Sequence, residues 1–158
     1  MSNPYDSVTD TLKHARRVGQ LMGALITDLV KRSQEHDHDK TDSGERGLFN
    51  KYTPLLAELE YGSLEYREAL KELAPALEIH YAKNRHHPEH FRGGVNDMTL
   101  VDLLEMLCDW KAASERVKNG SIERSLSIGE KRFSLSPQLA AILHNTVVFY
   151  GLDEKEEG

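Results

Sequence analysis

The N-terminal stretch SVTDTLKHARRVGQLMGALITDLVKRS (Ser7–Ser33) repeats its apolar residues every three or four positions. This repeat is the period of an amphipathic α-helix. Ser7 and Asp10 have the spacing of a capping box, in which two side chains satisfy backbone N–H groups at the start of a helix. The stretch therefore predicts one long helix at the beginning of the chain.

The same helical period returns in four later segments, whereas strand signals are nearly absent. These segments are 45–59, 63–80, 100–118 and 136–150. Pro54 predicts a kink in the first of them or its division into two short pieces. Residues 121–135 are read as irregular, with a small hairpin at 128–133 as the expected structure.

Helix-start signals precede several of these segments. Ser63 is a predicted N-cap, Thr99 with Asp102 forms a second capping box, and Ser136 precedes a proline at a first helical position. Together the patterns predict an all-α fold, namely a single-domain helical bundle of about five or six helices. We expect this domain to cover residues 1–151 and an acidic disordered tail to cover 152–158.

Composition argues against several classes of partner. The chain has 158 residues, and Lys+Arg 20 against Asp+Glu 26 gives a net charge of −6, which is unfavourable for nucleic-acid or anionic-membrane binding. No apolar run approaches the ~20 residues that span a bilayer, and the polar N-terminus lacks a signal-peptide pattern. The single cysteine, Cys108, cannot form an internal disulfide. We therefore expect a cytoplasmic protein.

A polar run, EHDHDK (Glu35–Lys40), follows the long helix. Imidazole and carboxylate groups hold divalent metals such as zinc, manganese or iron, and a lysine beside them could hold a phosphate. A solvated helix end is the bland interpretation of such a run. The rest of the chain favours the metal interpretation, because it supplies further histidines and one aspartate in an apolar stretch.

The candidate ligands come from separate helices or helix ends, which a bundle could bring to one interior point. His80 ends an apolar segment, and the run HHPEH lies in a loop or helix end. Asp109 lies between Cys108 and Trp110, where an unpaired buried carboxylate would be costly, so we expect it to be paired or metal-bound. In chain order the candidates are His14, His36, Asp37, His80, His86, His87 and Asp109.

The order of these residues resembles the HD-domain metal-dependent phosphohydrolases. The pattern of that superfamily is a histidine on an early helix, a His-Asp doublet and a later aspartate, which match His14, His36-Asp37 and Asp109. The continuation to Lys40 is similar to the His-Asp-x-x-Lys form of the HD-GYP branch. The Gly-Tyr-Pro motif of that branch is missing, so hydrolysis of cyclic-di-GMP is not implied. The combination of HDxxK, HHPEH and EMxxDW also resembles a small uncharacterised family of bacteria and their phages.

The resemblance implies an HD-domain-like fold and one or two divalent ions, from the set Mn, Fe, Co, Ni, Zn and Mg. It implies that Asp37 and Asp109 offset the metal charge, and that Lys40 stabilises charge developing on a phosphoryl group. Glu105 and Glu45 are candidates for supporting a ligand or transferring a proton. A second ion would be held by His80 with His86 or His87.

Two assignments stay open. The doublet could instead be His38-Asp39, although His36-Asp37 places Lys40 at the family position, and His38 and Asp39 are then expected to be spectators. Which of His80, His86, His87 and His90 bind the metal is also undecided.

The implied activity is hydrolysis of a small phosphorylated molecule, with a nucleotide as the first candidate, by attack of a metal-activated water on phosphorus. The alternative is a non-catalytic metal-binding or regulatory helical module, for instance one encoded by a phage. A homo-oligomer formed through the apolar last helix is a further open possibility. Neither the substrate nor the type of phosphate ester follows from the sequence.

Overall fold

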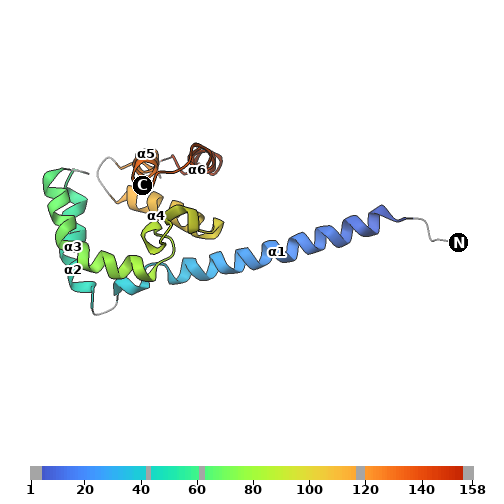
Figure 1. The fold of residues 1–158 in the computed structure, drawn as a ribbon, viewed down its shortest axis with the longest axis horizontal. Helices are drawn as coiled ribbons and strands as arrows, with labels where there is room; N and C mark the ends of the chain where they lie inside the picture. Colours follow the sequence, from blue (N-terminus) through green and yellow to red (C-terminus); the bar gives the residue numbers. More distant parts are fainter. Residues whose placement is uncertain (1–4, 42–43, 61–62, 117–119, 155–158) are drawn as a thin grey trace. The chain divides into compact units, whose positions relative to one another are not determined.

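A computed structural model describes residues 5–41, 44–60, 63–116 and 120–154 of the chain (Figure 1). Over these residues it contains helices and no strand, which confirms the all-α prediction. The α-helices are α1 (Ser7–Glu35), α2 (Arg46–Glu58), α3 (Leu64–Lys83), α4 (Leu100–Glu115), α5 (Ile122–Phe133) and α6 (Pro137–Phe149). The short 3-10 helices are η1 (His38–Thr41), η2 (Pro88–His90) and η3 (Gly94–Asp97). No helix in these ranges combines the length and apolar character required to cross a membrane.

Contacts within the chain divide it into two units, Met1–His36 and Asp37–Gly158. The first unit contains α1, and the second contains α2 to α6. The domain boundaries that the sequence predicted, one domain over 1–151, stay a prediction. Helix α1 has no buried residue, although it carries a regular apolar stripe.

Helix α1 begins at Ser7 as predicted, but its cap is a different residue. The carboxylate of Asp6 accepts hydrogen bonds from the backbone N–H groups of Val8 at 3.1 Å and Thr9 at 3.3 Å. The predicted capping box of Ser7 with Asp10 is therefore wrong, because Asp6 satisfies the free N–H groups from one position earlier.

Helices α2 and α3 pack against each other around a small apolar core. Its buried members are Tyr52, Ala69, Leu73 and Ala76. The sequence predicted a kink at Pro54 or a division into two short pieces; Pro54 lies inside α2, which runs as one helix, so the division is excluded. The hydroxyl of Ser63 accepts from the N–H of Tyr66 at 3.1 Å, which confirms it as the N-cap of α3. This helix ends one turn after His80 and so positions the first buried histidine.

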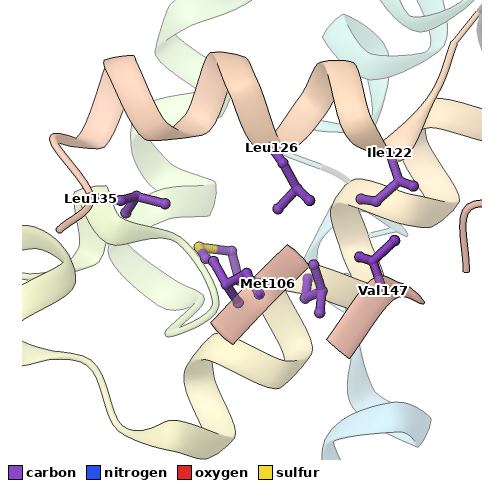
Figure 2. Close-up of a cluster of buried hydrophobic side chains, with 7 residues drawn as sticks. Met106, Ile122, Leu126, Leu135 and Val147 are labelled. Atoms are coloured by element: carbon purple, nitrogen blue, oxygen red, sulfur yellow. The ribbon is translucent and has the colours of Figure 1, made fainter. Parts of the chain in front are cut away.

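The larger core lies between α4, α5 and α6. Figure 2 shows Ile122 and Leu126 of α5 pointing toward Met106 of α4 and Val147 of α6. Met106 and Val147 are 0% exposed, so the centre of this cluster is removed from water. The predicted capping box of Thr99 with Asp102 starts α4, and Ser136 caps α6 with a proline at its first position. These two starts are confirmed.

Helix α5 occupies the segment that the sequence analysis read as irregular with a hairpin, and that prediction is wrong. Ser121 caps the helix by accepting from the N–H of Arg124 at 3.2 Å. Its buried face consists of Ile122, Leu126 and Gly129. A Cβ atom at Gly129 would lie 2.2 Å from Cη2 of Trp110, so the glycine is what allows α4 to approach α5 so closely.

The predicted disordered tail begins too early in the chain. The side chain of Leu152 packs against the larger core, and its N–H donates to the carbonyl of Val147 at 2.9 Å. Nζ of Lys111 donates to the carbonyl of Glu154 at 3.1 Å. The prediction of disorder is therefore wrong for 152–154, and residues 155–158 lie outside the described part of the chain.

Candidate metal centre

Four of the predicted ligands gather in the second unit, around the C-terminal end of α3. Asp37 directly precedes η1, His80 lies in the last turn of α3, and His86 and His87 lie between α3 and η2. One ligand atom from each of them lies within 4.8 Å of the others. His80 and His86 are both 1% exposed. Three imidazoles and one carboxylate, two of them buried and two partly buried, thus form a group that could hold a metal ion.

The distances show which atoms face one another. Nε2 of His80 lies 3.3 Å from Oδ1 of Asp37, and Nε2 of His86 lies 3.5 Å from the same oxygen. Nε2 of His80 lies 2.9 Å from Nε2 of His87. Three ring nitrogens and one carboxylate oxygen therefore converge, and this mixed donor set suits zinc, iron, manganese, cobalt and nickel better than magnesium.

Carboxylates orient two of these histidines from behind. Nδ1 of His80 lies 2.8 Å from Oδ2 of Asp39, and Nδ1 of His86 lies 3.2 Å from Oε1 of Glu105. A neutral histidine that donates its Nδ1–H presents the lone pair of Nε2 on the opposite side of the ring. Metal-binding histidines almost always have such a partner, because it fixes the ring and its tautomer. The chemistry of the donor set therefore fits a metal.

Burial lowers the pKa of two of these histidines, His80 and His87, and so favours their neutral form. Burial lowers the pKa of His80, and the positive charge of Lys40 lowers it further. The hydrogen bond to Asp39 acts to raise this pKa but does not outweigh the other two effects. Burial, together with the neighbouring His86 and His80, lowers the pKa of His87 to about 3. Neutral imidazoles are the form that binds metal, so His80 and His87 need not lose a proton near neutral pH to do so.

Asp39 is held as a carboxylate. Burial acts to raise its pKa, but hydrogen bonds from His80 and Asn84 outweigh burial and lower the pKa. The amide of Asn84 also donates to the carbonyl of His80 at 2.8 Å, which ties the end of α3 to this carboxylate.

Asp37 has a left-handed backbone, with φ 58°. Aspartate adopts this conformation more readily than most residues. The N–H of Lys40 donates to the carbonyl of Asp37 at 3.0 Å, and Nζ of Lys40 lies 2.5 Å from Oδ2. Because Lys40 engages Oδ2, Oδ1 is the oxygen turned toward the histidines. In this structure Lys40 contacts Asp37, a candidate metal ligand. The resemblance implied that Lys40 contacts the phosphate of a substrate.

One family model matches residues 3–148, and it describes a family of unknown function (DUF5662). The chain belongs to this family. No curated protein and no solved structure matches the chain. The likeness to HD-domain phosphohydrolases consequently remains a prediction from the residues and their order.

The structure does not bring His14 and His36 together. Helix α1 is unbroken between them, and at 1.5 Å per residue it separates them by about 30 Å. His36 is the C-cap of α1 and belongs to the first unit, so its role as a ligand stays a prediction. One chain therefore cannot place both histidines on the same ion.

The other predicted residues fall into two groups. Asp109 offers an oxygen within 4.8 Å of one from Asp37, and Glu105 supports His86. Glu45 lies outside these groups of possible ligands and its carboxylate lies 3.8 Å from Nζ of Lys83. Nδ1 of His90 lies 3.1 Å from the carbonyl of Tyr81, and His38 is exposed.

Sequence reasoning missed Asp39, which it expected to be a spectator. The alternation of aspartate with histidine in the polar run was the available signal, because it offers two carboxylates from one short turn. It could not show that Asp39 contacts a histidine 41 positions away.

Proposed function

We propose that the protein is a metal-dependent phosphohydrolase that acts on a small phosphorylated molecule, with a nucleotide as the first candidate. The observation that carries the proposal is the gathering of His80, His86, His87 and Asp37, with one ligand atom of each within 4.8 Å of the others, beside a cleft of about 520 Å³ that His87 lines. Small-molecule sites commonly have volumes of about 300–1,000 Å³. The ordered His, His-Asp and Asp residues of the HD-domain resemblance support the same activity.

Each side chain has a role in this proposal. Asp37, His80, His86 and His87 would hold one ion from the set Mn, Fe, Co, Ni, Zn and Mg. Such an ion, when bound, activates a water molecule and polarises a phosphoryl oxygen. Asp39 and Glu105 hold the rings of His80 and His86 in the binding tautomer. Lys40 holds Asp37, and Asp109 is near enough to Asp37 to share a second ion.

The net reaction needs no further reactant. The oxygen of water bonds to phosphorus, the bond between phosphorus and the leaving oxygen breaks, and one proton of the water ends on that leaving oxygen. Asp109, which has an oxygen within 4.8 Å of one from Asp37, would carry this proton.

The experiment is metal analysis combined with hydrolysis assays on protein purified without a histidine tag. We expect stoichiometric metal, and phosphate release from members of a nucleotide panel when manganese, iron, cobalt, nickel or zinc is supplied. His87→Gln should lose both metal and activity. His38→Gln is the matched control, because His38 lies in the same polar run but is exposed, and it should keep both.

Two results would refute parts of the proposal. Absence of stoichiometric metal after reconstitution would refute the centre itself. Stoichiometric metal without hydrolysis across the panel would favour the non-catalytic metal-binding module. The cytoplasmic location and the homo-oligomer remain predictions that this experiment does not address.

A further inference from the structure

The cleft beside the metal centre is built mainly from α5 and the end of α4. His87 is the member of the candidate ligand group that lines it. The ring of Tyr81 also lines it and lies 4.7 Å, centroid to centroid, from the ring of His87. A molecule bound in this cleft would therefore reach the centre through His87. The cleft-lining residues of the described chain do not include Lys40.

Arg132 lines the cleft and contacts two other cleft residues, Glu89 and Tyr81. Its Nη2 lies 2.5 Å from Oε1 of Glu89, and it also hydrogen bonds to the hydroxyl of Tyr81. The side chain of Arg132 is 52% exposed, and ion pairs at such exposure contribute little to stability. A phosphate, which accepts two parallel hydrogen bonds from a guanidinium, can therefore compete with Glu89 for it.

An aromatic wall faces the same cleft. The rings of Trp110 and Phe133 are stacked, with centroids 6.0 Å apart and 16° between their planes. Gly129 sets this wall, because any side chain there would meet the Trp110 ring. Partly buried aromatic faces of this kind bind planar rings by stacking.

We infer that Arg132 holds the phosphate of the substrate and that the wall of Trp110 and Phe133 holds a planar ring attached to it. The ligand class is thus an aromatic phosphate ester, of which a nucleoside monophosphate is one case. This inference rests on the proposed function for its substrate. It adds the binding residues, and it assigns to Arg132 the phosphate contact that the sequence resemblance gave to Lys40.

The test uses the single tryptophan of the chain, so quenching of its fluorescence reports on the wall. We expect AMP and GMP to quench the purified full chain saturably. Adenosine should bind about tenfold more weakly, since it lacks the charge-assisted bonds to Arg132, and ribose 5-phosphate should not quench. Arg132→Gln should weaken AMP about tenfold while changing adenosine binding little. Phe133→Leu should weaken both ring-bearing ligands.

Lys131→Gln is the matched control, because Lys131 is an exposed cation on the same helix outside the cleft. The inference is overturned if neither AMP nor GMP quenches saturably, or if Arg132→Gln and Lys131→Gln affect AMP equally. Failure of the proposed function looks different. In that case metal or hydrolysis is absent while AMP still quenches with the expected dependence on Arg132.

Discussion

Nε2 of His80 lies 2.9 Å from Nε2 of His87. Only one of two neutral imidazole nitrogens at this distance can carry a hydrogen. Because Asp39 accepts from Nδ1 of His80, the lone pair of His80 lies on Nε2 and His87 is the donor. His80 and His87 would each offer Nε2 to a bound cation, and His87 would then carry its hydrogen on Nδ1. Asp39 thus determines that His80 offers Nε2, and not Nδ1, to the candidate metal site.

Asp39→Asn tests this role. The amide has nearly the same shape, so the fold should be retained, but it can present its N–H group to His80 and lose the preference for the binding tautomer. We expect metal affinity to fall by about 10–100-fold, as for other partners of metal-binding histidines. Competition with a chelator of known affinity measures the change. Asp153→Asn, an exposed substitution, is the control, and equal affinities for the two variants would contradict the role.

Gly129→Ala tests the close approach of α4 to α5. The added methyl group would lie 2.2 Å from Cη2 and 2.5 Å from Cζ3 of Trp110, so the ring or the helix must move. Overpacking of this kind costs about 1–3 kcal/mol, which exceeds the gain of up to about 1 kcal/mol from alanine in a helix. We expect a lower free energy of unfolding by urea denaturation. Gly47→Ala is the control, because nothing lies within 4 Å of its Cβ position, and it should be neutral or stabilising.

Local sequence signals predicted most of the helices because their caps are local. Ser63, Thr99 and Ser136 each satisfy N–H groups a few residues away, and their helices begin where the sequence placed them. Helix α5 escaped prediction because Gly129 occupies a place on its buried face, which interrupts the apolar repeat. A glycine is favourable there because the ring of Trp110 leaves no room for a side chain. Trp110 lies on another helix, so the local sequence around Gly129 does not reveal this contact.

For the candidate site, too, the sequence identified individual residues but not the contacts between residues far apart in the chain. Residue chemistry alone singled out Asp37, His80, His86 and His87, since clustered histidines and carboxylates stand out in a sequence. The pairing of Glu89 with Arg132 did not follow, because it joins positions 43 residues apart. The separation of His14 from His36 was already contained in the prediction of one continuous helix, since residues so far apart on a helix cannot meet.

Asp102→Ala tests the buried support beneath the loop that carries His86 and His87. Asp102 is 0% exposed, closes the capping box of α4, and accepts from Nε and Nη2 of Arg85 at 3.1 and 2.9 Å. Removing it deletes the cap and leaves the polar groups around it without their acceptor. We expect a loss of about 2–4 kcal/mol in the free energy of unfolding.

Arg85→Ala is the companion variant for that prediction. The side chain of Arg85 is 44% exposed, so water can replace part of what it contributes, and the loss should be well below that of Asp102→Ala. Urea denaturation of both variants gives the comparison. Equal losses would show that the ion pair, rather than the cap, dominates.

The thiol of Cys108 reports on the charge around α4 in metal-free protein. Partial burial raises its pKa, and the carboxylates of Glu105 and Asp109 raise it further by disfavouring a thiolate beside them. Alkylation requires the thiolate, so the rate against pH should reach its midpoint above that of a small free thiol. Asp109→Asn removes one negative charge and should move the midpoint to lower pH, whereas Asp153→Asn should leave it in place. If the midpoint does not change in Asp109→Asn, the carboxylate of Asp109 is already neutralised in metal-free protein. Asp109 would then no longer be a candidate for holding a second ion.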